Sequence, residues 1–205
     1  MLPKLCIALD DPDTAVISKL LACLDPSQCW LKVGSILFTA YGPKLIKDLR
    51  RQGFAVFLDL KFHDIPNTVA KAVAAAIKLD VAMLTVHAAG GEAMLNAATS
   101  TAAAAKKPPK VVAVTALTSM DQYSLQQTGV LCSPQQLVQA RCKLAMQSNC
   151  DGVVCSGREL QDLRSSYPEA TLVCPGIRNA SDAAADQART VTPSFAVANG
   201  AGHPA

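Results

Sequence analysis

The sequence contains no uninterrupted apolar run of the length that a membrane-spanning helix requires. It also lacks a strong excess of charge, because the net charge is +3 and the basic residues are scattered along the chain. The lack of a long apolar run argues against a membrane segment. The small, scattered positive charge argues against a nucleic-acid-binding surface, whereas a small anionic ligand remains possible. The chain begins almost at once with strand-forming residues rather than a signal peptide, so we expect a cytoplasmic protein.

The eight cysteines include no C-x-x-C pair. Several lie within apolar segments, such as those around Cys6 and Cys174, so we expect buried, small hydrophobic residues. A disulfide framework is not expected in a chain of this size and compartment, and no ligand spacing indicates a zinc site. The first predicted strand is not followed by G-x-G-x-x-G, which disfavours a dinucleotide-binding fold.

The sequence does contain an alternation of short β-branched or apolar runs with longer segments of helical periodicity. Strands are predicted at 4–9, 29–33, 54–60, 82–86, 110–115, 151–154 and 170–174. Alternating strands and helices indicate parallel β/α units, and seven such units followed by a tail favour a TIM-type (β/α)8 barrel of the α/β class. A chain of 205 residues, 50% of them hydrophobic, is expected to form a single domain over 1–205.

One predicted strand carries charges inside an apolar run. Residues 54–60 are rich in Phe, Val and Leu, and an acid in such a buried run costs several kcal/mol unless it is paired. Asp59 and Lys61 share one face of this strand, because successive side chains alternate. Asp64 follows in the loop before Pro66, where parallel α/β folds place their chemistry. From these residues alone, a structural ion pair is as plausible as an active site.

Other strands also end in polar residues. Asp10 follows the first strand, where it can cap a helix or accept hydrogen bonds from a sugar. Lys32 interrupts the second strand and either extends its stem to water or pairs with a carboxylate. Its interval from Asp59 fits neighbouring strands joined by one helix, so Lys32 is the natural partner of Asp59. His87 ends the fourth strand, where a structural histidine is expected rather than a catalyst.

The run D-L-K-F-H-D-I-P-N-T at 59–68 resembles the signature of the orotidine 5′-phosphate decarboxylase family. Further similarities are A-x-D ending at Asp10, L-K-V-G around Lys32, L-T-S at 117–119, and P-G-I-R followed by D-Q-A-R within 175–189. The resemblance implies cofactor-independent decarboxylation of orotidine 5′-monophosphate to UMP and carbon dioxide in pyrimidine biosynthesis. It implies no metal site and gives no role to the histidines.

The resemblance also implies roles for individual residues. Lys61 would supply the proton, Asp59 would lie against the substrate carboxylate, and Lys32 would hold Asp59. Asp64 would complete the catalytic set from a partner subunit, so the functional unit would be a homodimer with shared sites. The residues implied to bind substrate are Asp10, Lys32, Ile65, Thr68, Thr118, Ser119, Arg178 and Gln187.

The resemblance ends at about Ala201. The family continues with an apolar strand ending in G-R-P, whose arginine binds phosphate, and with a final helix, whereas this chain ends Gly202-His203-Pro204-Ala205. We therefore expect a C-terminally incomplete barrel that lacks strand 8 and the final helix. Strands 1 and 7 would then have unpaired edges, and the chain would be a poor catalyst.

Two alternative functions stay open at this point. A magnesium-dependent sugar-phosphate decarboxylase of the same superfamily shares D-x-K-x-x-D, but it carries an acidic residue where this chain has Lys32. A catalytically impaired remnant that binds nucleotide weakly would follow from the loss of strand 8. Thr118 or Ser119 can also cap a helix, and this role is compatible with substrate binding.

Overall fold

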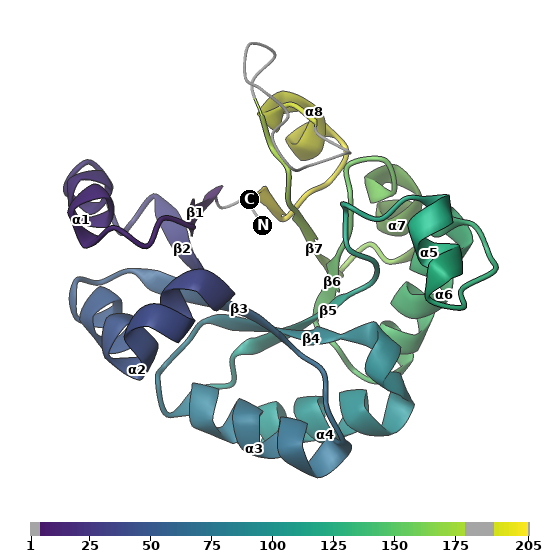
Figure 1. The fold of residues 1–205 in the computed structure, drawn as a ribbon, viewed down its shortest axis with the longest axis horizontal. Coiled ribbons are helices and arrows are strands. Elements are labelled where there is room, and N and C mark those ends of the chain that lie inside the picture. Colours follow the sequence, from purple (N-terminus) through teal and green to yellow (C-terminus); the bar gives the residue numbers. More distant parts are fainter. Residues whose placement is uncertain (1–4, 179–190, 205) are drawn as a thin grey trace.

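The computed structural model describes residues 5–178 and 191–204. Its strands form one parallel sheet in which every strand lies beside its neighbour in the sequence. They are β1 (Leu5–Leu9), β2 (Cys29–Gly34), β3 (Ala55–Phe62), β4 (Met83–His87), β5 (Lys110–Val114), β6 (Gly152–Val154), β7 (Thr171–Cys174) and β8 (His203–Pro204). The sheet curves into a nearly closed TIM-type (β/α)8 barrel, with the helices arranged around its outside (Figure 1).

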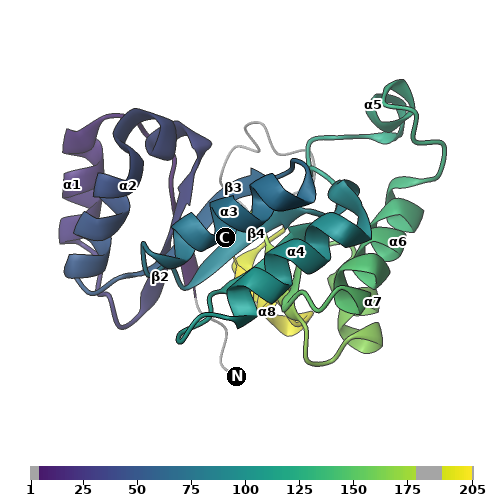
Figure 2. The same cartoon turned by 90° about the horizontal axis from the view of Figure 1, so that it is seen from below.

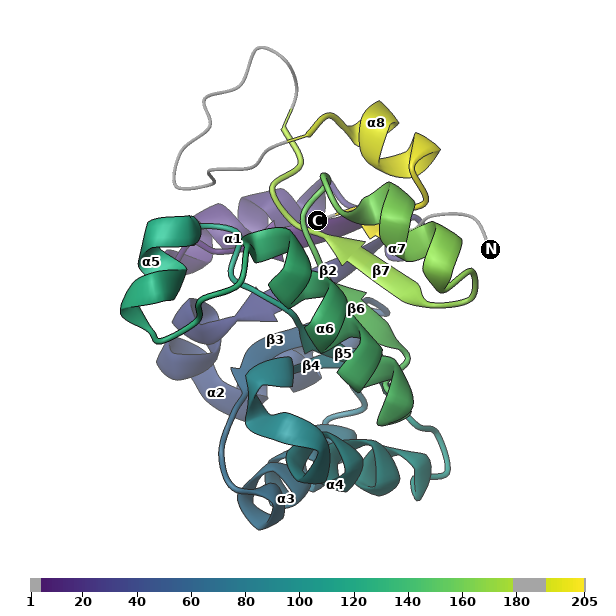
Figure 3. The same cartoon turned by 90° about the vertical axis from the view of Figure 1, so that its right-hand side faces the viewer.

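The helices follow the strands in alternation. They are α1 (Thr14–Ala22), α2 (Ser35–Arg51), α3 (Pro66–Ile77), the 3-10 turn η1 (Ala88–Gly90), α4 (Gly91–Ala103), α5 (Gln122–Gln127), α6 (Pro134–Gln147), α7 (Leu160–Ser166) and α8 (Pro193–Ala198). Figure 2 shows α3 and α4 side by side along the sheet, and Figure 3 shows α6 and α7 covering β5, β6 and β7. The short α5 stands away from this layer in Figure 2.

Local sequence explains where several helices begin. The Asp13 carboxylate accepts a hydrogen bond from Ala15 N and caps α1. At α6, Ser133 and Gln136 form a capping box in which each side chain accepts a hydrogen bond from the other residue's backbone N–H. Pro66 occupies the first turn of α3, where its missing N–H costs no hydrogen bond. The helices are therefore positioned by short-range signals that flank each strand.

The strands are buried on both faces, which explains their continuous apolar runs. Inside the barrel, the buried side chains that form one cluster are Cys6, Phe57, Met83, Val112 and Val173. A larger cluster between the strands and the helices includes Val33, Leu58, Leu84 and Leu95. The observed strands agree with the predicted segments to within one or two residues at each end.

The expectation that strand 8 is absent is wrong. His203 and Pro204 form β8, which pairs in parallel with Val173 and Cys174 of β7. The His203 ring packs against the Trp30 ring with a centroid distance of 4.6 Å, and it is 5% exposed. A two-residue segment thus gains both ladder pairing and burial. Within residues 5–178 and 191–204, β7 has a partner on each side, and no ladder joins β8 to β1.

All eight cysteines are free thiols, and six of them are buried. Cys23 is exposed and Cys132 is half-buried, so the expectation of burial is wrong for these two. Burial raises the pKa of Cys6 and Cys174 to about 12, which keeps both thiols protonated at neutral pH. In the part of the chain that the structure describes, no helix is long and apolar enough to cross a membrane.

Candidate active site

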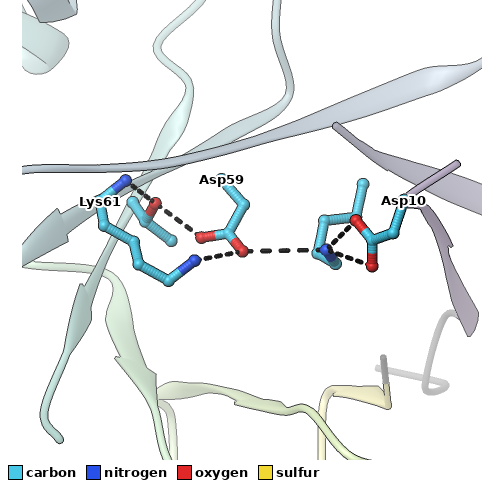
Figure 4. A network of polar contacts seen from close by, with 5 residues as sticks. Asp10, Asp59 and Lys61 are labelled. Atoms are coloured by element: carbon cyan, nitrogen blue, oxygen red, sulfur yellow. Dashed lines mark hydrogen bonds and ion pairs between the residues drawn. The ribbon is translucent and has the colours of Figure 1, made fainter. Parts of the chain in front are cut away.

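Four charged side chains form one row at the carboxyl ends of β1, β2 and β3, and we call Asp10, Lys32, Asp59 and Lys61 the charged row (Figure 4). Lys61 Nζ lies 2.8 Å from Asp59 Oδ2, and Lys32 Nζ lies 4.0 Å from the same oxygen. Lys32 Nζ also donates to both carboxylate oxygens of Asp10, at 3.2 and 3.4 Å. Acidic and basic groups therefore alternate along the row, and Lys32, which the strand spacing paired with Asp59, lies closer to Asp10.

The charged row depends on an irregularity in β3. Lys61 has φ = 51°, in the left-handed region that residues with a Cβ rarely adopt. The pairing of β3 with β4 changes register between Leu58 and Phe62, so Asp59 and Lys61 lie in a bulge rather than in a regular strand. Simple alternation predicted that the two side chains meet, but the bulge is what aims them at each other. Such a backbone costs on the order of 1–3 kcal/mol and is typical of functional sites.

Thr85 of β4 holds the bulge in place, and the sequence analysis missed it. Its hydroxyl donates to Asp59 Oδ1 at 2.9 Å and accepts from the backbone N–H of Lys61 at 2.8 Å. Thr85 is fully buried, so its hydrogen bond to Asp59 is shielded from water, whereas the bond from Lys61 N is partly buried. A polar residue in the middle of the apolar β4 segment was the signal that could have revealed it.

Asp59 is 9% exposed, and an isolated carboxylate at such a position would be strongly disfavoured. Two ammonium groups and one hydroxyl surround it, which compensates the loss of hydration. Asp10 differs from Asp59 in its exposure to solvent, because its side chain is 55% exposed. The row therefore runs from a buried carboxylate to one that is accessible from solvent.

Within the described residues, no hydrogen bond or ion pair joins Asp64, Ile65 or Thr68 to the charged row of the same chain. Asp64 and Ile65 lie on the turn from β3 into α3, Thr68 lies in the first turn of α3, and all three are exposed. Ile65 is 67% exposed, and its N–H donates to Asp64 Oδ1 at 2.6 Å. A cavity of about 300 Å³ lies beside this turn and is lined by residues that include Lys61, His63, Asp64 and Thr68.

Two histidines lie next to the charged row. The His63 and His87 rings stack with a centroid distance of 5.1 Å and an interplanar angle of 18°. The Nδ1 atom of His87 accepts a hydrogen bond from Ala89 N at 3.2 Å. Burial lowers the pKa of His87 to about 4, and the positive charges of Arg141 and Lys61 act in the same direction. The His87 ring is therefore neutral at physiological pH.

The loop after β5 carries Thr118 and Ser119, as the sequence analysis expected. Neither residue caps α5, because the Asp121 carboxylate does so by accepting from Ser124 N at 2.8 Å. The helix-capping alternative is therefore wrong. Arg141, which the sequence analysis did not single out, donates from Nη1 to the Thr115 carbonyl at 2.6 Å and so fixes the end of β5.

The expected phosphate-binding segment follows β7. Arg178 is half-buried, and its backbone N–H donates to Val191 O at 3.0 Å. Its Nη1 atom donates to the Ile177 carbonyl at 2.8 Å. Gln187, the other predicted phosphate contact in this segment, lies outside the described residues. Within 5–178 and 191–204, no group of three His, Cys, Asp or Glu side chains is placed to hold a metal ion.

Comparisons with known proteins agree with this geometry. Residues 3–205 match the family described as orotidine 5′-phosphate decarboxylase / HUMPS, so the match extends past Ala201. The chain is 48% identical over 201 residues to the orotidine 5′-phosphate decarboxylase of Nitrosococcus oceani, covering 98% of this chain and 87% of the relative. It is 46% identical over 202 residues to that of Hahella chejuensis, covering 98% and 87%.

Solved structures lead to the same family. The orotidine 5′-phosphate decarboxylase of Lactobacillus acidophilus superposes with a TM-score of 0.86 at 35% identity, covering 100% of this chain and 89% of that one. A protein of the same name from Thermotoga maritima superposes with a TM-score of 0.74 at 23% identity, which supports the fold alone.

Proposed function

Since the chain belongs to the orotidine 5′-phosphate decarboxylase / HUMPS family, we propose that its charged row decarboxylates orotidine 5′-monophosphate to UMP and carbon dioxide. This reaction is a step of pyrimidine biosynthesis and makes the protein a carboxy-lyase. The observation that carries the assignment is Asp59, a buried carboxylate held between Lys61 and Lys32. An enzyme of this reaction needs fixed charges of both signs at one point of its site.

The chemical difficulty is the electron pair that remains on C6 of the pyrimidine when the carboxylate leaves as carbon dioxide. With no delocalising cofactor in the proposed reaction, preorganised positive charge must stabilise that carbanion. We assign this role to Lys61, whose ammonium group points into the row (Figure 4). Lys61 then transfers a proton to C6, which completes UMP, and recovers its own proton from solvent.

Asp59 acts on the substrate carboxylate, at the other end of the bond that breaks at C6. Its negative charge lies against the substrate carboxylate and disfavours this group more than the transition state, in which the carboxylate charge has moved to C6. The hydrogen bond from Thr85 and the contact with Lys32 keep Asp59 in place. Without them, the carboxylate would turn away from the substrate, and its effect on the barrier would be lost.

The remaining contacts bind the nucleotide. We assign Asp10 and Lys32 to the ribose hydroxyls, because the Asp10 side chain is 55% exposed and Lys32 Nζ lies 3.2 Å from its carboxylate. Thr118 and Ser119 are assigned to the pyrimidine, and Arg178 and Gln187 to the phosphate. Loops after strand 7 of a barrel commonly bind phosphate, which supports the last assignment.

We propose a homodimer in which Asp64, Ile65 and Thr68 enter the partner's site. Large apolar side chains are exposed on segments that follow the carboxyl ends of the strands, which supports an interface on this face. They are Ile36, Ile65, Leu117, Tyr123 and Leu131.

Eight free thiols are consistent with a reducing compartment, and we propose the cytoplasm.

The alternatives receive less support. A magnesium-dependent decarboxylase needs an acidic ligand where this chain has Lys32, which is already paired with Asp10. An impaired remnant was expected because strand 8 seemed absent, but β8 is present. The similarity to curated decarboxylases over 98% of the chain also favours the decarboxylation of orotidine 5′-monophosphate.

The function can be tested by following the loss of orotidine 5′-monophosphate absorbance. The parent chain is expected to turn over the substrate, with no effect of EDTA. Lys61→Ala should abolish turnover while binding of UMP changes little, because the lysine acts mainly in the transition state. Lys71→Ala is the matched control, since Lys71 is an exposed residue of α3. Substantial turnover by Lys61→Ala, or inhibition by EDTA, would contradict the proposed mechanism.

A further inference from the structure

The turn between β3 and α3 is linked to the end of β4 by a pair of aromatic rings. We call His63 and His87 the histidine pair, because their rings stack at 5.1 Å. His87 is the last residue of β4, whereas His63 lies between Lys61 and Asp64 on the turn. The proposed chemistry uses neither ring, so the pair needs another explanation.

The surroundings of the pair favour one fixed arrangement. Ala89 N donates to His87 Nδ1, so the neutral His87 ring carries its proton on Nε2 and cannot rotate freely. Gly90 provides the space beside His63, because a Cβ at Gly90 would lie 3.3 Å from His63 Cδ2 and would collide with Met94 Sδ at 2.1 Å. The His63 ring therefore packs over η1 as well as over His87.

The charges around the histidine pair all lower the pKa of His87. Burial of the ring lowers the pKa of His87 most, and the charges of Arg141 on α6, of His63 and of Lys61 on β3 lower it further. A neutral His87 stacks on His63 without placing a further positive charge beside Lys61. The pair can thus persist over the pH range in which the proposed reaction runs.

Asp64 is the next residue after His63, and its carboxylate accepts a local hydrogen bond from the N–H of Ile65. Thr68 and Ile65 are exposed, so packing within the chain restrains this turn little. We infer that the histidine pair positions the β3–α3 turn so that Asp64 is presented to the active site of the partner subunit. Both histidines are positioning residues. This inference rests on the proposed homodimer with shared sites.

A positioning role of the histidine pair has a consequence that a general role in folding does not share. If Asp64 acts in the partner's site, loss of the pair in one chain impairs the site that receives this Asp64. The site that uses the same chain's Lys61 is spared. The effect can therefore be assigned to a chain in mixed dimers.

The experiment uses chains that are inactive alone. The reference mixture combines a Lys61→Ala chain with an Asp64→Ala chain, so its one competent site pairs intact Lys61 with intact Asp64 from the other chain. In the first test mixture, His63→Ala is added to the Lys61→Ala chain, which donates Asp64. In the second, His63→Ala is added to the Asp64→Ala chain, which donates Lys61. His63 is exposed, so its replacement is compatible with folding.

We expect the reference mixture to recover activity after verified subunit exchange. The first test mixture should have a kcat/KM about threefold to tenfold lower than the reference, the range that an aromatic pair supports. The second should match the reference. His63→Tyr in place of His63→Ala should restore the first mixture, because a flat ring can still stack on His87. His87→Leu should repeat the pattern of His63→Ala, and Lys71→Ala should change neither mixture.

Any other outcome would contradict the positioning role of the histidine pair. Equal losses in both test mixtures, a loss confined to the second, or no loss in either would overturn the positioning role. Activity that His63→Tyr does not restore would also overturn it, because the ring contact would then be irrelevant. A reference mixture without activity would reject the homodimer with shared sites, and the inference about the histidine pair with it.

Discussion

Asp59 and Asp80 each lie between two cationic side chains, at opposite ends of the barrel. Asp59 contacts the two lysines of the charged row and is 9% exposed. Asp80 lies before β4, where Arg50 Nε donates to Oδ2 at 3.2 Å and Lys107 Nζ lies 3.1 Å from Oδ1. The Asp80 side chain is 52% exposed. The same combination of charges thus occurs once in a shielded environment and once in water.

The backbone at the two sites is also similar. Lys61 has φ = 51° and Asp80 has φ = 53°, so each site contains a residue in the left-handed region. At Asp80 this conformation ends a helical turn, in which Asp80 N donates to Ile77 O at 3.0 Å. At Lys61 it interrupts a strand and redirects a side chain. Because water and salt screen the exposed site, we conclude that Asp80 links α2 to the loop that carries Lys107, whereas Asp59 is shielded as the proposed chemistry requires.

The largest expected effect comes from neutralising Asp59. Asp59→Asn keeps the shape of the side chain but removes the charge that opposes the substrate carboxylate. We expect kcat/KM to fall by about a thousandfold or more, since preorganised charge is usually the main source of rate enhancement. The assay is turnover of orotidine 5′-monophosphate. Asp80→Asn is the matched control, and a similar loss in both variants would break the comparison.

The next effect concerns Thr85, which has no counterpart at Asp80. Thr85→Val keeps the volume but removes the hydroxyl that bonds to Asp59 and to the N–H of Lys61. Because a hydrogen bond to a charged group is worth about 1.5–3 kcal/mol, we expect kcat/KM to fall about tenfold to a hundredfold. The measurement is kcat/KM together with urea unfolding. Unchanged kcat/KM would show that the bulge positions Asp59 without the hydroxyl.

Asp80→Asn should affect stability and leave turnover unchanged. Asparagine tolerates the left-handed backbone, so the substitution isolates the charge. We expect a loss of about 0.2–1 kcal/mol in the free energy of unfolding, reduced by added salt. Hydrogen bonding to Arg50 holds the pKa of Asp80 below its usual range, so this stability is present above the unfolded pKa and is lost as pH falls through the folded pKa. Urea unfolding at several pH values measures it, and a salt-independent difference would contradict the screened ion pair.

The last expected effect, confined to acid pH, is a difference in acid response near the charged row. The pKa of His87 is lowered from 6.5 to about 4 in the folded chain, so the unfolded state binds this proton first as pH falls. Stability is therefore lost progressively between those two pH values. His87→Phe should flatten the dependence of the urea midpoint on pH in that window, whereas Asp80→Asn should not. An identical slope for His87→Phe and the parent would show that His87 titrates normally.

The sequence determined the order and type of the elements. Alternating apolar runs and helical segments are local signals, and capping residues such as Asp13 and Ser133 mark helix starts over a few positions. The charged residues at strand ends were likewise visible, because parallel strands place their carboxyl ends at one edge of a barrel. The sequence therefore predicted that Asp10, Lys32, Asp59 and Lys61 lie together, and their role as an active site stays a prediction.

Only the tertiary structure decided how these groups meet. The bulge in β3, the hydroxyl of Thr85 between Asp59 and Lys61, and the stacking of His63 from the β3–α3 turn on His87 of β4 depend on contacts between segments far apart in the sequence. The same holds for β8, which two residues form because β7 and the Trp30 ring offer pairing and burial. Local periodicity carries no information on such contacts, since their energy comes from partners that the fold alone brings together.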